Sequence, residues 1–196
     1  MANNDLLNTP VLWINKYLQE KIGLLTGLDT PFFPSTPSTI DNLTTMFPDG
    51  GTMATWDRLV RMNRSAFPHI KCEQLMYYFY ATGSDPILNM VKIQEAVLRL
   101  MDRKDETAEE VNNWCMNRQV RLDDGSLVDN MFYFHDFKIY QLEETRDIID
   151  FGTARTYGGN KIIIDFDYHQ MNDLLVDPTT NEPWQPELKS STKTII

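Results

Sequence analysis

Apolar residues recur every three or four positions in the first part of the chain, which is the spacing of one face of an α-helix. Residues 6–25 carry a narrow apolar stripe formed by Leu7, Val11, Ile14, Leu18, Ile22 and Leu25. Thr9 is a suitable N-cap, Pro10 fits the first helical position and Gly27 is a plausible stop. We expect an amphipathic helix that packs on its own domain or docks onto a partner subunit.

A second and a third helix are predicted by the same spacing. Asp85 and Pro86 supply a cap and a first helical position. The inner face of this second helix is expected to consist of Ile87, Met90, Val91, Val97, Leu98 and Met101. Thr107-x-x-Glu110 matches a capping box, so a short helix is expected after it. Its apolar side would be Val111, Trp114 and Cys115.

Three segments are rich in aromatic and β-branched residues and predict strands: residues 70–81, 131–142 and 161–169. The last alternates, with Ile164, Phe166 and Tyr168 on one face and Asp165, Asp167 and His169 on the other. The segments between them predict weaker elements. We expect a short helical turn at residues 56–62, a hairpin turn at 123–126, a short strand at 147–151 and a turn with a glycine pair at 155–160.

This order of elements predicts an α+β fold with a mixed or antiparallel sheet and two or three packed helices. An N-terminal amphipathic helix is expected in residues 1–28, followed by a Pro/Gly-rich loop excursion in residues 29–64. Residues 65–176 are expected to form the core domain. Residues 177–196 are polar, contain three prolines and predict an extended C-terminal arm.

Composition narrows the function classes. The chain has 196 residues and a net charge of −10, and most of the excess acid lies after residue 84. No cluster of Lys and Arg is present to displace counterions, which argues against specific DNA binding. The two cysteines, Cys72 and Cys115, are expected to be reduced thiols in or near the core. Neither a signal peptide nor a run of roughly 20 apolar residues occurs, so no membrane contact is expected.

The best candidate for chemistry is the face of the last predicted strand. Asp165, Asp167 and His169 are possible ligands for a divalent cation, and His135 joins them only if the two strands pair in a suitable register. A solvent-facing strand shows the same alternation, and this interpretation is preferred. The histidines are scattered and no nucleophile elbow occurs. We therefore predict that the chain has no catalytic, cofactor or metal site and is not an enzyme.

A family resemblance is carried by two consecutive stretches, CEQLMYYFYATGSDPILNMVKIQEAVLRLMDRKDETAEEVNNW and FYFHDFKIYQLEETRDIIDFGTARTYGGNKIIIDFDYH. Their layout resembles the neck and tail-completion proteins of tailed bacteriophages, most closely the tail-terminator type. The resemblance covers residues 65–170. The first helix, the excursion and the arm are additions to the minimal terminator pattern, and they leave open another neck role, such as a connector adaptor or a sheath stabiliser.

The resemblance implies a structural virion protein, assembled in the host cytoplasm. Such proteins form a homo-oligomeric ring, commonly a hexamer, that terminates the tail and joins it to the head connector. Their partners are the connector and the tail tube or sheath proteins, and DNA passes through the lumen without specific binding. Carboxylates that repel phosphates would suit that lining, and we expect the candidates to be Glu143, Glu144, Asp165 and Asp167.

Two alternatives stay open. The chain could be an acidic adaptor or assembly chaperone that binds one protein partner. Less favoured is a small metal-dependent enzyme that uses the face of Asp165, Asp167 and His169.

Overall fold

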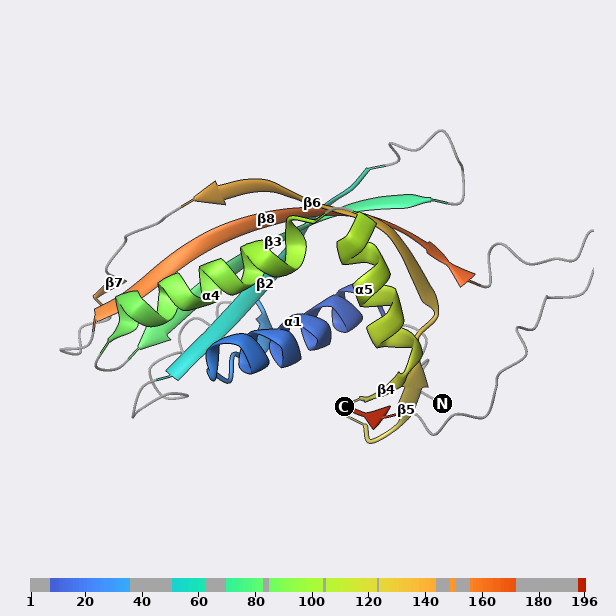
Figure 1. The fold of residues 1–196 in the computed structure, drawn as a ribbon, viewed down its shortest axis with the longest axis horizontal. Coiled ribbons are helices and arrows are strands. Elements are labelled where there is room, and N and C mark those ends of the chain that lie inside the picture. Colours follow the sequence, from blue (N-terminus) through green and yellow to red (C-terminus); the bar gives the residue numbers. More distant parts are fainter. Residues whose placement is uncertain are drawn as a thin grey trace, which may run out of the picture.

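A computed structural model describes most of the α+β domain. The described residues are 8–35, 51–62, 70–82, 85–103, 105–122, 124–143, 149–150, 156–171 and 194–196. Within them, helices gather on one side of a twisted mixed sheet (Figure 1). The predicted α+β class is therefore confirmed.

The main sheet has the strand order β1-β2-β3-β8-β6, and β7 pairs with β8. Its members are β1 (Phe32–Pro34), β2 (Gly51–Met62), β3 (Lys71–Thr82), β6 (Phe132–Glu143), β7 (Ile149–Asp150) and β8 (Thr156–Gln170). All pairs are antiparallel except β1 with β2, which is parallel. A smaller sheet joins β4 (Arg118–Arg121), β5 (Leu127–Asp129) and β9 (Thr194–Ile195), and β9 runs parallel to β4.

The first helix, α1 (Pro10–Thr26), follows the capping signals in the sequence. The Thr9 hydroxyl accepts a hydrogen bond from the Leu12 backbone N–H, and Pro10 occupies the first turn. Gly27 ends the helix in the left-handed conformation, with φ 73°, and donates its N–H to the Gly23 carbonyl. The predicted start at residue 6 is wrong, because Asn8 and Thr9 precede the helix.

The other two described helices are α4 (Pro86–Met101) and α5 (Asp105–Met116). The core lies between the helices and the sheet. It is built from alternate strand residues and the inner helix faces, including Trp13, Tyr17, Leu18, Leu75, Tyr77, Phe79, Val97, Trp114, Ile162, Ile164, Phe166 and Tyr168. The predicted inward face of the last strand and the burial of both free thiols are confirmed. The hairpin turn between β4 and β5 is also confirmed, with Gly125 at φ 84°.

Two segments predicted as turns are strands. Residues 56–62, expected as a helical turn, belong to β2, which pairs with β3 along its length and bulges after Arg58. Residues 51–62, placed in the excursion, are therefore part of the sheet. Gly158 and Gly159, expected in a turn, lie within β8 opposite Ala81 and Tyr80. In both cases pairing with β3 decides the conformation over local propensity.

Two helix predictions also need correction. Ile87 and Val91 are 73% and 49% exposed, because α4 turns Ile93, Ala96 and Leu100 inward instead. Thr107 is no cap, since α5 begins at Asp105. Its hydroxyl instead donates to the Leu100 carbonyl at 3.0 Å and accepts from the Arg103 N–H at 3.3 Å, which joins the end of α4 to α5.

Candidate assembly surface

Five apolar side chains form an exposed group on α1 and α4. We call this group the α1/α4 patch: Leu24 (74% exposed), Leu25 (53%), Ile87 (73%), Leu88 (47%) and Val91 (49%). The two parts of the patch meet where Leu25 of α1 and Val91 of α4 line one groove. A single exposed leucine is ordinary on a protein surface, whereas a contiguous set marks an interaction site.

A wider groove of about 760 Å³ borders the patch. Its lining is apolar on one part and charged on another: Leu24, Leu25, Leu98 and Leu100, together with Lys21, Arg99, Asp102, Arg103 and Glu110. An apolar centre beside a charged margin is the usual composition of a protein–protein interface.

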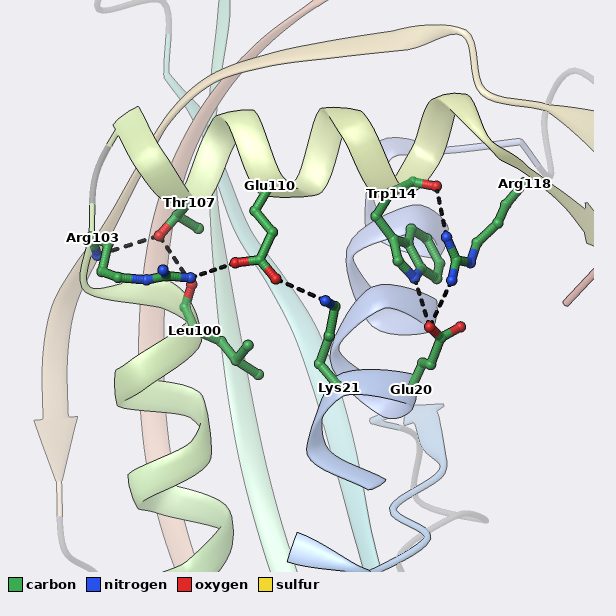
Figure 2. A network of polar contacts seen from close by, with 8 residues as sticks. All are labelled: Glu20, Lys21, Leu100, Arg103, Thr107, Glu110, Trp114 and Arg118. Carbon is green, nitrogen blue, oxygen red and sulfur yellow. Dashed lines mark hydrogen bonds and ion pairs between the residues drawn. The ribbon is translucent and has the colours of Figure 1, made fainter. Parts of the chain in front are cut away.

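The charged margin is a network that joins α1 to α5 (Figure 2). The Lys21 ammonium lies 2.8 Å from Glu110 Oε1, and the Arg103 guanidinium donates to Glu110 Oε2. Burial alone would raise the pKa of Glu110, but the hydrogen bonds from Lys21 and Arg103 outweigh it and lower this pKa below its ordinary value. Glu110 therefore stays ionised and holds a cation from each side.

A second set of contacts joins the adjacent residue of α1, Glu20, to the other end of α5. Glu20 Oε1 accepts from the Arg118 guanidinium at 2.8 Å and from the Trp114 indole N–H at 3.1 Å (Figure 2). The Arg118 guanidinium also lies over the Trp114 ring, 4.6 Å from its centroid. Together the two halves of the network hold α1 against α5 and β4, so the α1 part of the patch sits on a fixed support.

A second exposed apolar site, formed by two aromatic residues, lies on β6. Tyr133 and Tyr140 are 43% and 58% exposed. Among the described strands β6 is an edge of the main sheet and pairs with β8. Part of its outer edge is closed by Asn112 of α5, whose side chain donates to the Phe134 carbonyl at 2.8 Å and accepts from the Phe134 N–H at 2.9 Å. Tyr140 lies beyond this closed part.

The four residues predicted to line a lumen lie in different places in the structure. Asp165 and Asp167 lie on the sheet face away from the helices, and both are half-buried. Asp165 Oδ1 accepts from the Gln74 amide at 2.6 Å and faces Lys138 across the β6–β8 pair. Glu143 ends β6 opposite Lys161, and Glu144 lies outside the described residues.

Of the predicted metal candidates, the two histidines come together, whereas Asp165 does not join them. His169 is only 8% exposed, and its Nδ1 lies 2.7 Å from Nε2 of His135, so the register that would unite the two histidines does occur. Among the described residues, no group of three or more His, Cys, Asp or Glu side chains is arranged to hold a metal ion. Asp165 is engaged elsewhere with Gln74.

Sequence patterns missed the α1/α4 patch, although a signal for it exists. Apolar residues stand at 87, 88, 90 and 91 of α4, which is wider than one helix face. Such a width indicates a second apolar contact in addition to the core. The prediction placed Ile87 and Val91 on the inner face of the helix, and the second apolar contact was therefore missed.

Comparison with known families and with curated protein sequences assigns the chain to no family. No known family matches the chain, and no curated protein sequence is significantly similar to it. Of the helices in the described residues, none has the length and apolarity needed to cross a bilayer.

Proposed function

We propose that this chain is a structural subunit that assembles with copies of itself into a ring, and that the ring terminates the tail in the neck of a tailed bacteriophage. The α1/α4 patch carries the assembly part of the proposal. The phage part rests on the resemblance over residues 65–170, which span β3 to β8 of the main sheet together with α4 and α5.

Energetics favour a covered patch. Full burial of a Leu, Ile or Val side chain contributes about 1.5–3 kcal/mol. Each patch residue is 47–74% exposed, so covering it would contribute about 1 kcal/mol or more, and the five together about 5 kcal/mol. This gain must exceed the cost of association, which a ring divides among repeated contacts.

A ring closes through a head-to-tail contact, so each subunit needs two different surfaces. The described exposed hydrophobic residues supply two candidates. One is the α1/α4 patch, and the other is the open part of β6 around Tyr140. Tyr140 is the extra residue where the β6–β8 register shifts between Ile139 and Gln141, so this part of β6 offers an exposed aromatic side chain and not a regular row of unpaired backbone groups. We propose that the patch of one copy contacts this edge of the next.

The sheet face away from the helices would then be available to the lumen. It carries Asp165 and Asp167, and the chain as a whole has a net charge of −10. Negative charge along a channel lets phosphates pass without binding. Asp165 contributes less to this field than an isolated carboxylate, because Lys138 lies opposite it. Connector and tail tube or sheath proteins would contact the two rims of the ring.

Light scattering coupled to gel filtration tests the assembly, with negative-stain images of the same fractions. The full chain should elute as one closed oligomer and appear as a ring with a central hole. Val91→Glu in the patch should give a smaller species, because it places a charge in the apolar contact. Tyr140→Lys on β6 should do the same.

Met116→Glu is the matched control. Met116 is 53% exposed at the end of α5 and lies outside both proposed contacts, so this variant should keep the ring. Circular dichroism must show the same helix content in all variants. A full chain that stays monomeric at high concentration would refute the proposal, as would a ring that tolerates both Val91→Glu and Tyr140→Lys.

A further inference from the structure

We infer that the β9 segment of one copy, residues 194–196, pairs with β4 of the neighbouring copy, so that exchanged strands link the subunits of the ring. The inference rests on the proposed ring and names a second contact within it. The partner is another copy of this chain, and the surface that it recognises is the open edge of the small sheet.

The β9 segment binds β4 through backbone groups. The Thr194 N–H donates to the Asn117 carbonyl at 3.0 Å, and the Ile196 N–H donates to the Gln119 carbonyl at 2.9 Å. The Arg121 N–H donates to the Ile196 carbonyl at 3.0 Å. β9 is the edge strand of the small sheet and runs parallel to β4 (Figure 1). Because these bonds use the main chain, the β4 edge accepts this segment equally well from its own chain or from a second copy.

The acceptor edge adjoins the α1/α4 patch. Ile196 is half-buried, packs against the core and lines a hollow of about 530 Å³ together with residues of α1. Leu24 lines this hollow too, and it is also the most exposed residue of the patch. A neighbouring copy that covers the patch therefore stands beside the β4 edge.

The chain before β9 is longer than closure within one copy requires. The Met171 N–H donates to the Met131 carbonyl at 2.8 Å, and Asp129, two residues before Met131, is opposite Gln119. Steps of about 5 Å between strands and 3.4 Å along them place Met171 within about 26 Å of Thr194. Residues 172–193, which contain three prolines, reach about 70 Å when extended.

That reach is sufficient for exchange between neighbours. In the proposed ring, Tyr140 of the next copy lies at the patch. Met171 is beside Met131, which precedes Tyr140 by nine residues, so the connecting chain of that copy starts about 35 Å from the contact. About half of the available reach then remains for the path from the patch to β4.

The pair is also short enough to open. β9 has two residues, and three backbone hydrogen bonds hold the segment. Such a pair opens readily by itself, whereas a neighbour fixed in a ring presents its own segment at high effective concentration. Each copy would donate one segment and accept another, which repeats around the ring in the same way as the head-to-tail contact.

Disulfide trapping between two single variants tests the exchange. Gln119 and Ile195 are directly opposed in the parallel pair, so cysteines at these positions are close enough to join. Gln119→Cys and Ile195→Cys chains are refolded together under reducing conditions and then oxidised. Each chain carries only one half of the pair, so the disulfide forms only between copies. The expected product is a linked dimer on a non-reducing gel. Glu106→Cys, at an exposed position on α5, replaces Gln119→Cys as the matched control and should give no such dimer.

Light scattering of the same samples separates this inference from the proposed ring. A ring whose mixed variants stay unlinked, while the double variant closes its disulfide within one chain, would overturn the exchange and leave the ring intact. Linked dimers that form no ring would support the exchange and refute the ring, and monomers throughout would overturn both. Removing residues 194–196 should raise the concentration at which half of the ring dissociates at least tenfold, and an unchanged value would also overturn the exchange.

Discussion

The contact between Asn112 and Phe134 offers the sharpest test of how the sheet edge is closed. Asn112 is 4% exposed on α5, and its amide makes two hydrogen bonds to the backbone of one residue of β6. The pattern is that of a neighbouring strand, which would also pair with both the N–H and the C=O of Phe134. We consider the substitution Asn112→Ala, which removes both partners at once.

The expected cost follows from those two groups. A buried backbone donor or acceptor left without a partner costs about 1–3 kcal/mol, so the pair costs about 2–6 kcal/mol. Alanine is the better helix former by about 0.7 kcal/mol, which offsets part of this. The net loss in the free energy of unfolding should be about 3 kcal/mol. Asn113→Ala is the matched control, because Asn113 is the exposed neighbour on the same helix and should gain about 0.5 kcal/mol.

Urea unfolding monitored by circular dichroism and tryptophan fluorescence measures both variants. Protein concentration must be equal throughout, because assembly stabilises the folded chain by mass action. The two substitutions should separate by about 3.5 kcal/mol with unchanged m-values, which would place the effect in the folded state. A difference below about 1 kcal/mol would mean that water or a shifted strand satisfies Phe134, and that Asn112 does not close the edge.

Two further predictions concern ion pairs. Arg58→Ala should lower the free energy of unfolding by about 3 kcal/mol, because the Glu73 side chain, 2% exposed as a residue, would lose its bidentate guanidinium partner. The double variant with Glu73→Gln should recover part of the loss in urea melts, and failure to do so would show that charge is not the cause. The lowered pKa of Glu110 means that its contribution is complete above its ordinary pKa of 4.5 and disappears as pH falls through the folded-state value. Glu110→Gln should therefore flatten the decline of melting temperature below pH 4.5, whereas Glu106→Gln, at an exposed position, should not; equal profiles would contradict the assignment.

Much of the fold was predictable where the signal is local. Thr9, Pro10 and Gly27 define α1 because capping depends on neighbouring backbone groups. The strands β3, β6 and the main part of β8 follow from runs of aromatic and branched residues. β2 was missed because its residues 56–62 are a strand only through pairing with β3.

The sites were less predictable, for a related reason. His135 and His169 are separated by 34 positions and meet through a bulge, which no periodicity encodes. Asn112 bonds to a strand 22 residues away. The assignment of Thr107 and Glu110 to a capping box shows the same limit, since both side chains bond to groups outside the first turn of α5.

The exposed face of α4 bears most directly on function. Core packing of this helix is complete without Ile87, Leu88 and Val91, since Met90, Ile93 and Val97 already face the sheet and α1. An exposed helix face that serves the fold alone favours polar residues, because apolar ones promote nonspecific association. Three apolar residues here, beside two more at the end of α1, therefore cost solubility and contribute nothing to the isolated domain. That cost is offset only if another surface covers them in the working state of the protein, which is the physical argument for assembly.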